Sequence, residues 1–356
     1  SAIGSILVPI GESFNIGVRT QSIVFPFNYF GQIVIVFFIG YFADKFGKKI
    51  THIISIFLLG LFALLFKFIN SFPLLLAVFL FTGIFGISIN TISDAVVSDS
   101  FEKRKGIYLN IAHVFFSLGA MTSPVIFNLV FSRTSNFRTI YFILFFMSFV
   151  ILFLVAVAKY PQKDGTQIRP AIIFSILKNH KLITICIFAT ISFGTLHAVA
   201  GWIPTLFQKN LNISEAFSNY SLSIFWFAVT IGRILVATLS KKLDEITLMK
   251  WLNILAFCFL AISFFLNSYL LLTIDYFIFG IVVGGLIPLI IAYSAKIYPE
   301  HSSTRIATVF SFGATGMLII PMVIGMLGEY FAISKTLSFT SALFLAYMYI
   351  LQKKLH

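Results

Sequence analysis

Long apolar runs, separated by short polar connections, recur along the whole 356-residue chain. Each run is close to the ~20 residues that an α-helix needs to cross a bilayer. Strands of a membrane barrel would alternate polar and apolar positions over short segments, and these runs do not alternate. Because a backbone inside lipid must satisfy its own hydrogen bonds, helices are the element that fits. The pattern therefore predicts an all-α integral membrane protein.

Eleven complete membrane spans and one partial span are predicted. They cover residues 1–13 (partial), 20–43, 50–69, 73–98, 106–131, 137–158, 182–208, 217–240, 247–267, 269–297, 304–329 and 335–352. Because Ser1 already lies in an apolar stretch, we expect the first helix to begin upstream of it. The longest connection predicts two six-span bundles, over 1–158 and 182–356, joined by a cytoplasmic linker over 159–181.

Composition and charge support this interpretation and exclude other classes. Hydrophobic residues make up 59% of the chain, charged residues 10%, and the mean hydropathy is +1.01. The net charge of +13 does not predict a nucleic-acid partner, because the basic residues are spread over short connections. Most of them follow even-numbered spans, so the positive-inside rule places both termini in the cytoplasm. We expect a multi-pass protein of the cell membrane, plasma or inner, that works as a monomer.

No pattern for enzymatic chemistry is present in the sequence. Cys186 and Cys258 both fall inside apolar spans, where they are expected to act as small core residues rather than as a disulfide. We find no phosphate-binding loop, metal-ligand cluster or nucleophile–base pair. The sequence therefore predicts no catalytic residue, no metal and no cofactor, and a proton gradient as the expected energy source.

The connection between the second and third spans is unusually rich in charge and glycine. It reads GYFADKFGKK and resembles the signature G-x-x-x-D-(R/K)-x-G-(R/K)-(R/K) of the major facilitator superfamily. The matching residues are Gly40, Asp44, Lys45, Gly47, Lys48 and Lys49. Gly40 would permit a close helix approach, Gly47 a tight turn, and Asp44 a bond to a helix N-terminus or a cation.

This resemblance implies a fold and a mechanism. The fold would be the major facilitator fold, with twelve helices in two pseudo-symmetric six-helix bundles. A small solute would bind between the bundles and be exposed alternately to each side. The charged connection would be a gate that latches the bundles together. The alternative is a basic loop that only orients its helices.

Two further spans are similar to the fucose permease branch, which contains sugar–proton symporters. Span 106–131 matches the branch pattern at Leu109, Asn110, His113, Gly119 and Pro124. Span 182–208 keeps Gly194 and Trp202, but Leu196 stands at the position where the branch has an acid, with His197 beside it. The resemblance implies a sugar as solute, while this departure leaves the coupling acid open.

Amide side chains inside spans are candidates for solute contact, because polar groups in lipid are costly. Asn28 and Gln32 share one face of the second span, and Asn90 lies on the fourth. An amide both donates and accepts hydrogen bonds, which suits the hydroxyls of a sugar. The alternative is that these amides hold neighbouring helices together.

The fifth span presents Asn110, His113 and Ser117 on one face. An imidazole can bond a hydroxyl-rich solute or relay a proton near neutral pH. We predict solute contact by Asn110 and His113, with an interhelical hydrogen bond as the alternative.

The seventh span carries His197 and Trp202 among Gly194 and Gly201, and Trp226 lies near the middle of the eighth. Glycines in this pattern predict a helix that can break, and the aromatic rings could stack on a sugar. We predict solute contact by His197, Trp202 and Trp226. Trp202 has the alternative of an interfacial belt residue.

Charged side chains within spans are few. Asp94 shares a face with Asn90 and is predicted, with His113, to carry a coupled proton; the alternative is an ion pair with the gate. Arg233 would contact an anionic solute or stabilise the helix contacts of its span. Asp275 is interpreted as a boundary residue at the outer end of its span.

Together these patterns predict a secondary transporter for a small polar organic solute, with a monosaccharide favoured and proton symport as the coupling mode. Its partners would be that solute and the lipid bilayer. One alternative is an organic-anion or metabolite carrier or exporter that uses Arg233. Another, from a different class, is a membrane receptor that does not transport.

Overall fold

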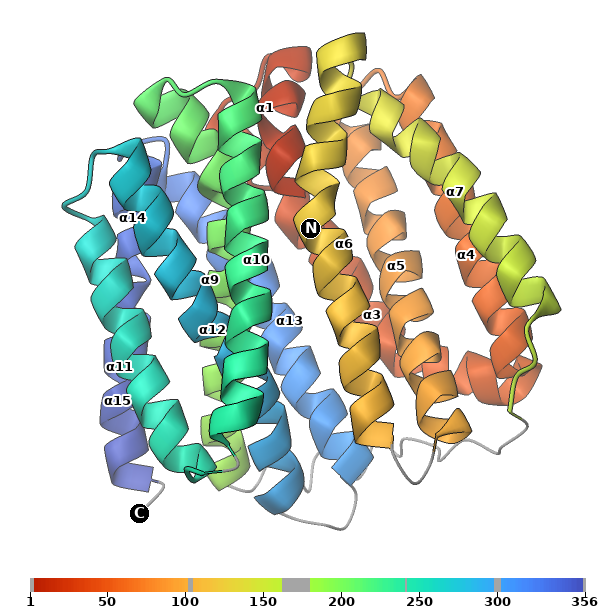
Figure 1. The fold of residues 1–356 in the computed structure, drawn as a ribbon. Helices are drawn as coiled ribbons and strands as arrows, with labels where there is room; N and C mark the ends of the chain where they lie inside the picture. Colours follow the sequence, from red (N-terminus) through yellow and green to blue (C-terminus); the bar gives the residue numbers. More distant parts are fainter. Residues whose placement is uncertain (1–2, 102–104, 162–179, 241, 298–301, 355–356) are drawn as a thin grey trace. The chain divides into compact units, whose positions relative to one another are not determined.

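The computed structural model describes residues 3–101, 105–161, 180–240, 242–297 and 302–354, and it is helical throughout the long apolar runs (Figure 1). The first half contains α1 (Ile3–Phe14), α2 (Val18–Gln21), α3 (Val24–Phe46), α4 (Lys48–Leu65), η1 (Phe66–Phe68), α5 (Phe72–Ser100), α6 (Lys105–Thr134) and α7 (Arg138–Val157). The second half contains α9 (His180–Thr205), η3 (Leu206–Asn210), α10 (Glu215–Leu239), α11 (Glu245–Ser263), α12 (Tyr269–Ile297), α13 (Ser302–Leu327), α14 (Ile333–Phe339) and α15 (Ser341–Lys354).

Each predicted span has a helix at its place. Within the described residues, nine helices are long and apolar enough to cross a membrane. Of the three remaining predicted spans, the first corresponds to the shorter helix α1 and the second to α3. The last is divided at Thr340 into α14 and α15. Most of the predicted linker, from residue 162 to 179, lies outside the described residues.

Backbone packing groups the chain into two compact units. The larger unit contains residues 1–22, 117–128 and 169–356, and the smaller unit contains 23–116 and 129–168. This grouping differs from the predicted halves, because α1 and the middle of α6 pack with the C-terminal helices. The division into two six-helix bundles stays a prediction.

Glycines let the helices of the larger unit approach closely. Gly194 of α9 lies against the backbone of Gly316 in α13, and Gly232 of α10 lies against Ile281 of α12. In the same contact, Gly284 of α12 lies against the backbone of Val229 in α10. A side chain at these positions would hold the backbones apart, which is why small residues mark helix contacts in membranes.

The smaller unit has the same kind of contact at fewer places. Gly83 of α5 packs on the backbone of Asn28 in α3, and Gly60 of α4 packs on Ser148 of α7. The outer face of α7 is covered by exposed phenylalanines, among them Phe146 and Phe153. One face of this helix therefore binds protein, and the rest is suited to lipid.

Helix α9, at the place of the seventh span, is continuous at its glycines in this structure, and its capacity to break there stays a prediction. Helix α9 runs unbroken through Gly194 and Gly201, because both glycines fill close contacts: Gly201 packs on Gly4 of α1. The regular helix ends just after Pro204, where the chain continues as a π-helical turn.

Candidate functional site

A line of polar and aromatic side chains runs along one face of α10. Its members follow helical steps of four and three residues: Asn219, Ser223, Trp226, Thr230 and Arg233. Among them, Asn219, Ser223 and Trp226 are buried. Such a line inside a predicted span is costly unless the groups bond one another or a ligand.

Both ends of this line are bonded to α6. At one end Asn219 Nδ2 donates to Asn128 Oδ1 over 2.8 Å, and Asn128 Nδ2 donates to the carbonyl of Ala216 over 3.0 Å. At the other end Arg233 Nη1 donates to Ser117 Oγ over 2.5 Å. Ser117 and Asn128 share a face of α6, since they are separated by about three turns. The middle of α6 thus runs along α10.

Trp226 lies midway between these two bridges, about 10 Å along the helix from each. Its side chain is 1% exposed, and its Nε1 has no hydrogen-bond partner among the described residues. The ring of His197, from α9, meets the indole edge to face at 6.1 Å between centroids. The pair joins two helices at the centre of the polar line.

The tautomer of His197 follows from its hydrogen bond. Nδ1 lies 2.9 Å from the carbonyl oxygen of Phe193, which can only accept, so Nδ1 carries the proton. In the neutral ring Nε2 is then an acceptor. An indole donor and an imidazole acceptor therefore stand side by side, which is a pattern that a hydroxyl group can satisfy.

Trp202 lies in the packing between two helices. Its side chain is fully buried between α9 and α13, and Nε1 donates to the carbonyl of Pro321 over 2.9 Å. The belt interpretation was wrong, because a belt residue would reach the surface. The indole secures a contact between two helices, and its solute role stays a prediction.

The side-chain amides of Asn28 and Gln32 form hydrogen bonds at the contact between α3 and α5. Asn28 Nδ2 donates to the carbonyl of Phe79 over 3.0 Å, which joins α3 to α5 beside Gly83. Gln32 Nε2 donates to Asn28 Oδ1 over 2.9 Å. These bonds match the interhelical alternative, while contact with a solute stays untested.

The remaining predicted residues lie on α5 and α6. Asn90 is exposed and Asp94 is half-buried, one turn apart on α5. Asn110 and His113 belong to α6, but their side chains lie outside the described part of the structure. Ser117, seven residues after Asn110, bonds Arg233.

The predicted gate forms a tight turn between α3 and α4. Gly47 has φ +87°, a conformation that glycine adopts without strain, so the prediction for this residue is confirmed. Thr51 Oγ1 donates to the carbonyl of Gly47 over 2.9 Å. Among the described residues no atom lies within 4 Å of where a Cβ of Gly40 would stand, so its close helix approach stays a prediction.

The lysines of this turn hold helices of the smaller unit together. Lys48 forms an ion pair with Asp99, near the end of α5. Lys49 Nζ donates to the carbonyl of Ala158, just after α7, over 3.0 Å. Lys45 lies over the rings of its neighbours Tyr41 and Phe46. The side chain of Asp44 lies outside the described part.

Two groups near this turn were missed by the sequence analysis. One feature of the sequence could have identified Asp99: it is an acid at the end of a span that comes back to the same side as the basic turn. His52 of α4 lies buried between two hydroxyls, with Nδ1 2.5 Å from Tyr160 Oη and Nε2 3.5 Å from Ser93 Oγ. Partial burial raises the pKa of Tyr160, which keeps its hydroxyl protonated for this contact.

Asp275 was interpreted as a boundary residue at the outer end of its span, and the structure adds that its side chain is buried. The residue is 4% exposed within α12, and its Oδ2 has no hydrogen-bond partner among the described residues. A buried acid in a membrane span is expensive and marks a functional position. Helical spacing gave no sign of this burial, because α12 is apolar on every side.

Comparisons with known proteins identify the family of this chain. A family model described as "Major Facilitator Superfamily" matches residues 1–321. The chain therefore belongs to the major facilitator superfamily and is a multi-pass membrane transporter rather than an enzyme.

Two curated relatives cover different parts of the chain. A TsgA homolog of Buchnera aphidicola subsp. Schizaphis graminum is 22% identical and covers 98% of this chain and 89% of its own length. The glucose/mannose transporter GlcP of Bacillus subtilis is 25% identical, over 60% of this chain and 55% of its own length.

Solved structures show the same fold at low identity. A bacterial homolog of the human lysosomal transporter Spinster gives a TM-score of 0.81 at 12% identity, covering 99% of this chain and 93% of that one. The nucleoside transporter NupG gives 0.81 at 10%, covering 99% and 96%. These likenesses confirm the predicted major facilitator fold.

Proposed function

We propose that this transporter carries a small neutral polar solute, with a monosaccharide as the favoured class, by alternating access and in symport with protons. The observation that carries the proposal is the pair of Trp226 and His197. The pair offers a buried indole donor and an imidazole acceptor at the middle of a polar line. The glucose/mannose transporter among the relatives supports the same class.

A sugar ring fits this pair for a physical reason. One face of a pyranose carries C–H groups, which pack on the flat surface of an indole. Its hydroxyls both donate and accept, so they can receive the Trp226 N–H and donate to His197 Nε2. The buried Trp226 N–H has no partner among the described residues, so a hydroxyl that accepts from it would relieve the cost of its burial.

Hydrogen bonds at the two ends of the polar line hold a neighbouring helix beside the Trp226–His197 pair. The bridges from Asn219 to Asn128 and from Arg233 to Ser117 hold α6 along α10, on both sides of Trp226. From their match to the fucose permease pattern, we propose Asn110 and His113 as further contacts for the solute.

Three groups are candidates for the coupled proton. Asp94 and His113 come from the sequence, and Asp275 comes from its burial without a partner at Oδ2. A carboxyl group inside a span binds a proton readily, because the charged form is poorly solvated there. Substitution of the group that carries the coupled proton would leave solute exchange intact. It would abolish solute accumulation driven by a pH gradient.

Arg233 is less suited to an anionic solute than to a positioning role. At least one of its guanidinium donors is engaged by Ser117 of α6. An organic-anion carrier would instead direct this cation at the solute. Neutral solutes should therefore be transported in preference to organic anions.

The test is a solute screen in proteoliposomes with a pH-sensitive dye in the lumen. Hexoses, pentoses, nucleosides and carboxylates are added outside, one at a time. A saturable lumenal acidification with one sugar supports the proposal. A response to carboxylates alone would contradict it, and uptake without any pH change would remove the proton-coupling part.

A further inference from the structure

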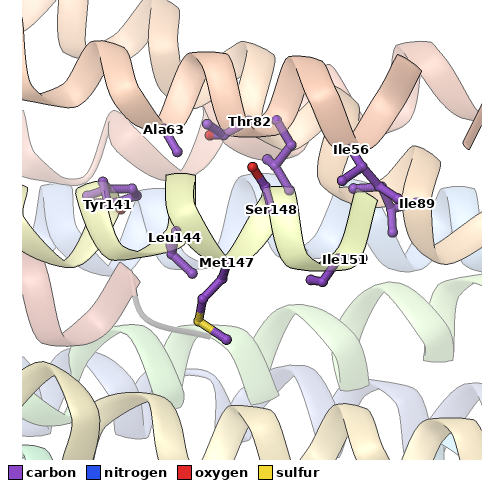
Figure 2. A pocket seen from close by; sticks show the side chains of 10 residues that line it. Ile56, Ala63, Thr82, Ile89, Tyr141, Leu144, Met147, Ser148 and Ile151 are labelled. Carbon is purple, nitrogen blue, oxygen red and sulfur yellow. The ribbon is translucent and has the colours of Figure 1, made fainter. Parts of the chain in front are cut away.

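An apolar groove lies between α4, α5 and α7 of the smaller unit, apart from the residues discussed above. Its volume is about 310 Å³, and Figure 2 shows side chains of all three helices around it. Its lining extends on α7 from Tyr141 to Ile151. None of the residues predicted to contact solute belongs to this lining.

The lining of the groove is mostly apolar, so it favours an apolar occupant. Its two aliphatic hydroxyls are already bonded within their own helices: Thr82 Oγ1 donates to Phe79 over 3.0 Å, and Ser148 Oγ donates to Phe145 over 2.6 Å. A polar solute would gain little from such a surface. A hydrocarbon chain would lose nothing there and would fill space between the helices.

The length of the groove matches half of a membrane. The eleven residues from Tyr141 to Ile151 span about 15 Å along α7. The hydrocarbon core of a bilayer is about 30 Å thick, so the groove is as long as the acyl region of one leaflet.

Two basic residues stand at the Tyr141 end of the groove. Arg138 begins α7, one turn before Tyr141, and its Nη2 donates to the carbonyl of Ile69 over 3.1 Å. Lys67 belongs to η1, is exposed, and places its Nζ 5.0 Å from the ring centre of Phe142. The positive charge is thus held one helical turn beyond the apolar part.

This spacing is that of a phospholipid, whose phosphate lies just beyond its acyl chains. We propose that the groove binds one acyl chain of an anionic phospholipid and that Lys67 and Arg138 contact its phosphate. By the predicted topology, the lipid comes from the leaflet opposite the basic cytoplasmic loops. Charge complementarity at the mouth and the dry interior select an anionic lipid over a neutral solute.

The test measures lipid retention on the purified full chain, without any solute. The protein is extracted in detergent, mixed with phosphatidylglycerol or phosphatidylcholine, and the bound lipid is counted by native mass spectrometry. We expect preferential retention of one phosphatidylglycerol. Each basic side chain contributes to attraction of anionic lipid, so Lys67→Gln with Arg138→Gln should lower retention about tenfold.

Matched variants separate this site from general effects. Arg133→Gln removes an exposed cation at the end of α6 and should leave retention unchanged. Met147→Trp narrows the groove from its lining and should lower retention, whereas Phe146→Trp, on the exposed face of α7, should not. Because Arg138 also bonds Ile69, Lys67→Gln alone serves if the double variant fails to fold.

Two results would overturn the proposal. One is equal retention of phosphatidylglycerol and phosphatidylcholine by the natural protein. The other is a loss in Arg133→Gln or Phe146→Trp as large as in the groove variants, which would mean that the lipid covers the surface without a site.

Discussion

Helices α7 and α9 are both strongly apolar, yet they have opposite surroundings. The most apolar 18-residue stretch of α7 has a mean hydropathy of 3.0 and is 11% buried in protein. The corresponding stretch of α9 has a mean hydropathy of 1.9 and is 78% buried. The less apolar helix is thus the one that the protein encloses.

The difference teaches that hydropathy and packing are separate signals. Hydropathy places a helix in the membrane, because lipid and protein interior are both apolar. Small and polar residues decide which apolar helix meets other helices. Helix α9 carries Gly194, Gly201 and His197, whereas α7 carries a run of phenylalanines and no glycine.

The largest effect on stability is expected for a substitution in α9, the helix that protein encloses. In Gly194→Ala the new methyl would stand 2.6 Å from the Gly316 carbonyl oxygen, so α9 and α13 must separate. We expect a loss of roughly 1–3 kcal/mol, seen as a lower melting temperature in detergent. Gly86→Ala is the control, because no atom of the described part of the chain lies within 4 Å of its Cβ position. Equal melting temperatures for the two variants would contradict this packing.

A smaller effect is expected from the bridge between α6 and α10. A double-mutant cycle of Asn128→Leu and Asn219→Leu isolates the hydrogen bond between the two amides. Interhelical bonds of this kind contribute about 0.6 kcal/mol in membranes. A reversible unfolding titration measures the coupling, and additive losses from the two single variants would show that the bond contributes nothing.

The smallest effect is expected on α7. Phe153 is 67% exposed, so Phe153→Ala removes a side chain that meets lipid rather than protein. Stability should change by less than about 0.5 kcal/mol, as for other surface substitutions. A loss of stability as large as that of Gly194→Ala would contradict this, because it would mean that Phe153 packs against protein.

The sequence predicted the helices well and their neighbours poorly. Span positions follow from local composition, and the turn at Gly47 follows from a conformation that glycine alone adopts easily. The open surroundings of Gly40 and the burial of Trp202 depend on which helix lies opposite. No local pattern records that choice.

The candidate site shows the same limit. Trp226 and His197 were both predicted as solute contacts, but only the fold brings their rings together. Asp275 stayed hidden, because an acid near a span end looks the same whether it faces water or protein. Motifs identify residue types, and tertiary contacts decide which of them meet.

The most direct test of the central claim is sugar counterflow by the natural protein, Trp226→Leu and Trp251→Leu in proteoliposomes. Trp251 is 61% exposed on α11 and is the matched control. The account predicts that Trp226→Leu lowers the specific uptake rate about tenfold, the equivalent of ~1.4 kcal/mol, at unchanged protein yield. Trp251→Leu should transport normally. Full counterflow by Trp226→Leu would contradict the claim that a sugar binds beside His197 on α10.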